Sequence, residues 1–152
     1  MSFSTPPEIV AQAERAAFGK IALSTPRTLV AAMLAGIYIA MGGLLSLLIG
    51  YGFPEWTAHN PGLQRLLSGC MFPLGLILVV LAGAELFTGN NGVLIPGLMN
   101  RKYGWAPVLK NWVLVYIGNF IGAICFVYVM IWGAGIVDAD PWKSAIIQIA
   151  QA

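Results

Sequence analysis

The chain has 152 residues, of which 59% are hydrophobic and only 9% are charged, whereas roughly a quarter of an ordinary soluble domain is charged. Eight basic and six acidic residues are too few to cover a water-facing surface, and a chain so rich in apolar residues is not disordered. The net charge of +2 is too small for a nucleic-acid footprint, so we expect no nucleic-acid partner. The composition indicates a membrane protein whose first partner is the lipid bilayer.

Residues 1–27 predict an amphipathic helix at the cytoplasmic membrane surface, with a soluble tail as the alternative. The stretch Thr5-Pro6-Pro7-Glu8 has an N-cap residue, a proline in the first turn and an acid three residues after the cap. Apolar residues then recur on one face at helical spacing: Ile9, Val10, Ala13, Ala17 and Ile21. A signal peptide is excluded because the segment lacks a short apolar core and a small-residue cleavage site.

Three membrane crossings are expected, at about 28–53, 66–99 with a break, and 107–136. No charged residue lies between Arg27 and Glu55 or between Lys110 and Asp138. Each of these gaps allows a helix of about 40 Å, enough to cross a hydrocarbon core of roughly 30 Å. Residues 28–137 therefore predict an all-α transmembrane unit, and residues 138–152 an extracytoplasmic linker toward a fourth helix that the chain does not reach.

Basic residues predict the orientation of these crossings. Six of them precede the first crossing or lie between the second and the third: Arg15, Lys20, Arg27, Arg101, Lys102 and Lys110. The opposite ends of the crossings carry only Arg65 and Lys143. Because basic residues accumulate in cytoplasmic loops, we expect the N-terminus in the cytoplasm and the C-terminus outside.

The second crossing is interrupted by a polar stretch over 83–92, which we expect in the middle or outer half of the membrane. It contains one carboxylate, two amides and three glycines. Backbone that leaves a helix at membrane depth must be buried in protein or line a watery cavity, and helix ends exposed there offer N–H groups to an anion. We interpret the stretch as a broken helix and a candidate site. The alternative is an external loop between two shorter helices.

Glu85 and several glycines allow either a functional or a structural role. Glu85 could handle ions or accept backbone N–H bonds that brace the turn, and we favour the structural role. Gly118 and Gly122 form a GxxxG motif that contains Asn119, and this spacing favours close helix packing over ligand contact. The same packing role is expected for Gly36, Gly42 and Gly43. Three tryptophans lie near predicted membrane boundaries: Trp56, Trp105 and Trp142.

The stretch Leu81-Ala82-Gly83-Ala84-Glu85-Leu86-Phe87-Thr88-Gly89 resembles the first signature of the formate/nitrite transporter family. The stretches 72–76 and 110–123 resemble the family's helices before the break and after it, so the likeness spans essentially the whole chain. The resemblance implies an aquaporin-like fold of six crossings built from two inverted repeats, of which this chain carries the first. It also implies a homopentamer when the protein is full length, in the inner (cytoplasmic) membrane of a bacterium or archaeon.

The resemblance also assigns roles to single residues. Leu86 and Phe87 would form the outer constriction of a pore, and Phe72 and Leu76 the inner one. Thr88 would lie on the substrate pathway and bond the pore histidine. The remaining motif residues would form the loop: Gly83, Glu85, Gly89 and Asn90. The family's histidine belongs to the second repeat, which is missing here. His59 is the only histidine, and it lies in a predicted loop, so it is not assigned this role.

The resulting hypothesis is a channel for small monovalent anions, formate first and nitrite or hydrosulfide next, with proton-linked passage. No cofactor and no metal are expected. An enzyme would need paired histidine, cysteine or carboxylate ligands within the helices, where the sequence has one carboxylate, Glu85, and two cysteines far apart, Cys70 and Cys125. The rival hypothesis is a three-helix structural or assembly subunit that does not transport.

Overall fold

The computed structural model describes residues 3–151, and over this range its regular elements are all helices. The all-α prediction is therefore confirmed. The helices are α1 (Pro6–Ala22), α2 (Thr25–Tyr51), α3 (Pro54–Thr57), α4 (Pro61–Met71), α5 (Pro73–Ala82), α6 (Phe87–Met99), α7 (Trp105–Val127), a π-helical turn (Tyr128–Gly133) and α8 (Trp142–Gln151).

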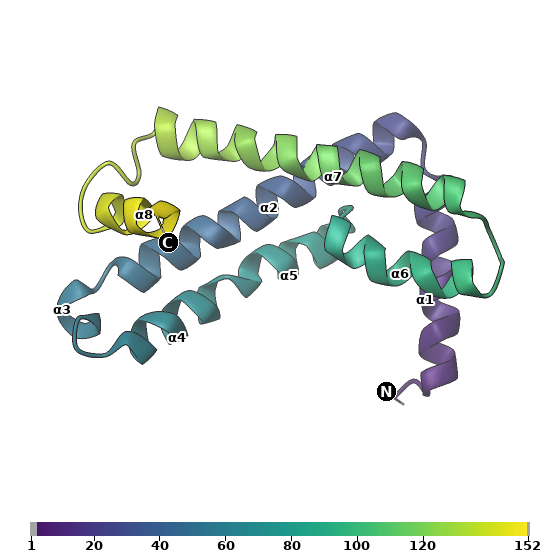
Figure 1. Ribbon diagram of the computed structural model, residues 1–152, viewed down its shortest axis with the longest axis horizontal. Coiled ribbons are helices and arrows are strands. Elements are labelled where there is room, and N and C mark those ends of the chain that lie inside the picture. Colours follow the sequence, from purple (N-terminus) through teal and green to yellow (C-terminus); the bar gives the residue numbers. More distant parts are fainter. Residues whose placement is uncertain (1–2, 152) are drawn as a thin grey trace.

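Three of the helical stretches are long and apolar enough to cross a membrane: Thr25–Tyr51, Pro61–Ala82 and Trp105–Gly133. They run roughly along the long axis of the molecule, with α1 across one end and α3 and α8 at the other (Figure 1). The prediction of three crossings is confirmed. The second crossing starts at Pro61 rather than near residue 66, because Arg65 lies inside α4 instead of marking its boundary.

The second crossing is broken, as expected, but the non-helical part is shorter than predicted. The backbone leaves the helix at Gly83, whose φ of 60° lies in the left-handed region that glycine tolerates, and it becomes helical again at Phe87. We call residues 83–86 the break. The stretch from Phe87 to Gly92 forms the first turns of α6.

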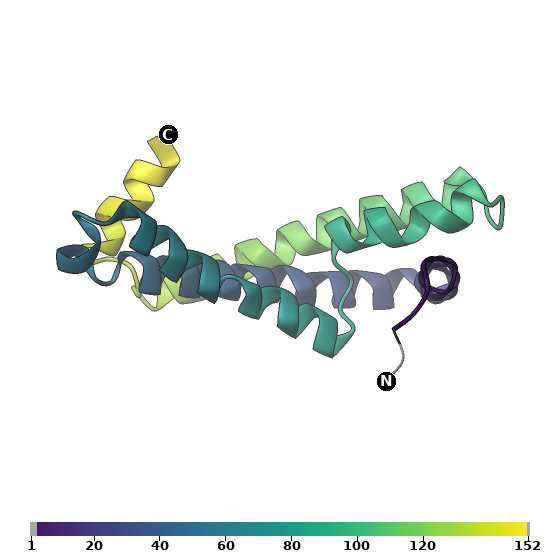
Figure 2. The same ribbon diagram turned by 90° about the horizontal axis from the view of Figure 1, so that it is seen from below.

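The break lies inside the bundle and not in an external loop. The backbone N–H of Glu85 donates to the Ala31 carbonyl of α2 at 3.2 Å. Leu86, like Ile39 of α2, packs against the buried cluster that contains Ala35. Helix α6 then continues along the long axis beyond α5 with a sideways offset (Figure 2). The break therefore extends from the middle of α2 toward its N-terminal end, whereas we expected it in the middle or toward the opposite end.

Helices α2 and α7 approach each other through small residues. A Cβ atom on Gly118 would lie 2.5 Å from that of Ala32, and one on Gly122 would overlap the backbone of Met33. A larger residue at either position would force the two helices apart. The packing role predicted for this GxxxG pair is therefore confirmed.

The glycines of α2 differ from one another. A Cβ atom on Gly36 would overlap the backbone of Asn119, and one on Gly42 would lie 2.7 Å from the Phe72 carbonyl oxygen. Both therefore serve close packing, as predicted. The prediction is wrong for Gly43, where an added Cβ would meet no heavy atom within 4 Å.

Helix α1 begins with the predicted cap. The backbone N–H of Thr5 donates to the Glu8 carboxylate at 2.7 Å, and the Thr5 hydroxyl donates to it at 3.0 Å. These two hydrogen bonds hold the pKa of Glu8 below its ordinary value. The apolar face divides along the helix, because Ala17 is fully buried while Ile9 is 55% exposed. The C-terminal half of α1 is thus docked on α6 and α7 through Ala17, Leu94 and Val108.

Residues 138–151 contain a helix that the linker prediction did not include. Helix α8 packs on the C-terminal end of α2, where the indole N–H of Trp142 donates to the Leu48 carbonyl oxygen at 3.0 Å. Val137 and Ile146 belong to the apolar cluster that joins this end of the molecule.

Candidate functional site

The break collects polar side chains from several elements around Glu85, which is only 3% exposed. One carboxylate oxygen accepts a hydrogen bond from the Lys20 ammonium of α1 at 2.8 Å. The other oxygen accepts from the Asn90 amide of α6 at 2.7 Å. The same Asn90 nitrogen donates to Asn111 of α7 at 2.8 Å. This polar network therefore joins α1, the break, α6 and α7.

Burying a lone carboxylate is expensive, and a charge partner with further hydrogen bonds offsets that cost. Lys20 and Asn90 supply both at Glu85. The carboxylate therefore bonds to two side chains, whereas the structural role that we favoured for it used backbone N–H groups. Sequence reasoning missed Lys20 as a site residue and used it only for orientation, because no motif or periodicity connects residue 20 with residue 85.

Asn119, the second residue of the Gly118–Gly122 motif of α7, makes a second set of hydrogen bonds. Its side-chain oxygen accepts a hydrogen bond from the backbone N–H of Phe87 at 2.9 Å. Its side-chain nitrogen donates to the carbonyl oxygens of Glu85 and Ala32, each at 2.8 Å. One amide thus serves a first-turn N–H group of α6, which has no partner within its own helix, and a carbonyl of the break. An amide inside an apolar crossing was the signal that could have revealed this role.

A cavity of about 260 Å³ lies beside the break, and we call it the break cavity. Among the residues that line it are Lys20 and five predicted site residues: Leu76, Gly83, Leu86, Gly89 and Asn90. The wall is otherwise apolar. The structure thus brings one residue of each predicted constriction, Leu76 and Leu86, to the same cavity as the ammonium of Lys20.

The other predicted site residues lie elsewhere. Phe72 is one turn before Leu76, is 47% exposed and does not line the break cavity. Phe87 faces α7, where its ring meets that of Tyr116 at a centroid distance of 5.4 Å. Phe87 lines a second cavity of about 280 Å³ that Leu86 also borders. Thr88 is exposed on the first turn of α6.

Two features set the electrostatics around the break cavity: the Lys20–Glu85 ion pair and the N-terminal end of α6. The charge of Lys20 is balanced by Glu85, whereas the N-terminal turn of α6 carries the partial positive charge of its macrodipole. Gly89 of this turn borders the cavity. Within residues 3–151, no group of three or more histidine, cysteine, aspartate or glutamate side chains could hold a metal ion.

A crossing that is broken around buried polar groups, beside a cavity, is an arrangement typical of membrane channels and transporters. Residues 7–152 match the profile of the family described as Formate/nitrite transporter. The chain belongs to this family, as its sequence motifs suggested.

Relatives and a solved structure support the same assignment. The chain is 36% identical to the "Probable formate transporter" of Methanothermobacter thermautotrophicus, covering 91% of this chain and 47% of that protein. It is 34% identical to the "Formate channel FocA" of Escherichia coli K12, with the same coverage of 91% and 47%. A solved "FNT family ion channel" matches with a TM-score of 0.70 and 26% identity, over 86% of this chain and 50% of that one. The chain spans about half the length of the curated relatives it matches.

Proposed function

We propose that the chain forms half of the pore of a channel for small monovalent anions, with formate as the first substrate and nitrite or hydrosulfide next. The observation that carries this proposal is the break cavity, where Leu76 and Leu86 meet the N-terminal turn of α6 and the ammonium of Lys20. The relatives named as formate transporters and channels support the choice of formate.

The apolar wall of the break cavity favours proton-linked passage of the anion. A neutral weak acid crosses an apolar ring far more easily than its anion, because burying an unpaired charge is costly. The break contacts α2 at Ala31, nearer the N-terminal end of α2 than Gly42, which lies against Phe72. With α1 on the cytoplasmic side, Leu86 and Phe87 therefore form the inner ring in this proposal. Phe72 and Leu76 form the outer ring, which reverses the order that the sequence suggested. The positive end of α6 attracts the anion toward the space between them.

The remaining motif residues complete the proposal. Thr88 faces a pore histidine supplied by the second half of the protein. Glu85, Gly83, Gly89 and Asn90 hold the shape of the break. In its membrane the protein is a homopentamer in the inner membrane of a bacterium or archaeon, with α1 on the cytoplasmic side.

The first test is the intact mass of the polypeptide in its native membrane. A mass near twice 16.2 kDa identifies this chain as one half of a six-crossing pore. A mass of 16.2 kDa requires pairing with another copy or partner. Protein that inserts into liposomes but gives no formate-dependent flux would contradict the channel and support the rival, a structural or assembly subunit.

Flux of labelled formate into proteoliposomes then tests the constriction. Leu86→Ala should raise anion leak, because it removes apolar bulk from the break cavity. Leu81→Ala is the matched control, since Leu81 is 79% exposed on α5 and does not line that cavity. Equal flux in the two variants contradicts the assignment of Leu86. Thr88→Val should shift the pH dependence of uptake, and an unaltered pH profile removes Thr88 from the mechanism.

A further inference from the structure

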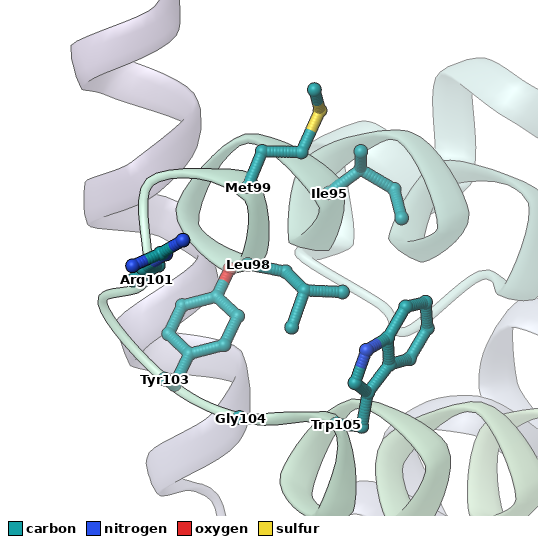
Figure 3. A pocket seen from close by; sticks show the side chains of 7 residues that line it. All are labelled: Ile95, Leu98, Met99, Arg101, Tyr103, Gly104 and Trp105. Carbon is teal, nitrogen blue, oxygen red and sulfur yellow. The ribbon is translucent and has the colours of Figure 1, made fainter.

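A larger cavity, of about 760 Å³, lies between the end of α6 and the start of α7. We call it the end cavity. Figure 3 shows its wall, with Ile95, Leu98 and Met99 projecting from α6 and Trp105 from the first turn of α7. Met99 and Trp105 are 76% and 58% exposed, so the cavity opens to the surface. It shares no lining residue with the break cavity.

One cation, Arg101, borders this apolar wall. Arg101 has a φ of 56° and is the one residue other than glycine with positive φ within residues 3–151. It stands where α6 ends, and the next residue, Lys102, closes the turn with a hydrogen bond from its N–H to the Gly97 carbonyl at 2.8 Å. Glycine is usual at such a position because its backbone adopts positive φ without strain. An arginine held in this conformation suggests a role for its side chain.

The guanidinium of Arg101 is available for an anion. In the part of the chain that the structure describes, the ion pair found within 4.0 Å joins Lys20 and Glu85, so no carboxylate pairs with Arg101. Glu14 of α1 approaches the same turn, but its carboxylate accepts a hydrogen bond from the Asn100 amide.

The end cavity also lies where a membrane would end. The third apolar span begins at Trp105, and tryptophan concentrates at the boundary between headgroups and hydrocarbon. A ligand that fits both Arg101 and the apolar wall has an anionic group joined directly to a hydrocarbon chain. The bilayer itself supplies such a molecule at this depth, and basic residues next to a membrane span attract it.

We propose that the end cavity binds an anionic phospholipid. The phosphate accepts charge-assisted hydrogen bonds from the guanidinium of Arg101. An acyl chain packs along Leu98, Met99 and Ile95. The proposal rests on the geometry of this cavity alone and does not depend on which anion the protein conducts.

Native mass spectrometry tests the site. The protein is purified in the form in which it occurs in its native membrane. The protein is supplied with equal amounts of phosphatidylglycerol and phosphatidylcholine in mild detergent. We expect preferential retention of phosphatidylglycerol, and in Arg101→Gly a preference reduced about fivefold. Lys102→Ala is the matched control, since Lys102 does not line the cavity, and it should keep the preference.

The fold of the variant is checked independently. Because glycine favours the backbone conformation of Arg101, Arg101→Gly should unfold at a temperature no lower than that of the unchanged protein. A photoreactive residue in place of Met99 should form lipid adducts in membranes. An unchanged preference in Arg101→Gly, or an equal loss in Lys102→Ala, would overturn the proposal. Adducts between Met99 positions and another protein chain would also overturn it, by showing that protein covers the cavity.

Discussion

Replacing Asn119 by leucine should loosen the break while leaving the size of the side chain nearly unchanged. The change removes the hydrogen bonds at 2.8 and 2.9 Å to Glu85, Phe87 and Ala32. A hydrogen bond between membrane helices contributes about 0.6 kcal/mol on average, and a buried backbone group left without a partner costs about 1–3 kcal/mol. Since a carbonyl of the break and an N–H of α6 both lose their partner, we expect a cost of about 2–6 kcal/mol.

Amide hydrogen exchange over residues 85–90 measures this cost locally, because exchange there reports the free energy of opening the break. A loss of about 2 kcal/mol corresponds to roughly 30-fold faster exchange. Asn91→Leu is the matched control, since the side-chain oxygen of Asn91 is buried and has no hydrogen-bond partner within residues 3–151. Equal protection in Asn119→Leu and the unchanged protein would refute the reasoning, and so would an equal loss in Asn91→Leu.

Two further predictions concern helix packing and the cap of α1. Gly122→Ala should lower the thermal unfolding temperature, because its Cβ overlaps the Met33 backbone and overpacking costs about 1–3 kcal/mol. Gly43→Ala should be neutral or stabilising by up to about 1 kcal/mol, and similar destabilisation of both variants contradicts the packing argument. The hydrogen bonds from Thr5 lower the folded-state pKa of Glu8, so the cap is fully present above the ordinary carboxyl pKa and is lost as pH falls through the lowered value. Protection factors at the start of α1 should fall over this acid range, and Glu8→Gln should remove the dependence; protection that does not change with pH contradicts it.

The absence of charge was a good guide to two of the three crossings. The predicted range 28–53 became Thr25–Tyr51, and 107–136 became Trp105–Gly133, because apolar length is the main requirement for spanning a bilayer. The same rule placed the start of the second crossing too late, near residue 66. Arg65 is an exposed residue within α4, and a long basic side chain near a helix end can reach the aqueous boundary while its backbone stays helical.

The site was predictable where its residues are neighbours in the chain. The motif around residue 85 identified Glu85, Gly83 and Asn90, since all lie within one short segment. The partners that hold them could not be found in this way, because Lys20 is 65 positions from Glu85 and Asn119 is 34 positions away. The directions of the side chains after the break also could not be predicted from the sequence. The break interrupts the helical periodicity that otherwise relates the direction of one side chain to the next.

The break is held in place by the described chain itself, because the polar groups of Glu85 are already paired within residues 3–151. The N–H of Glu85 bonds to Ala31, its carbonyl to Asn119 and its carboxylate to Lys20 and Asn90. Unpaired, these groups would make a break at membrane depth costly. Because the partners come from α1, α2, α6 and α7, the wall that carries Leu86 forms only when all four helices are in place. A change in any one partner should therefore act on the break cavity even where that partner does not line it.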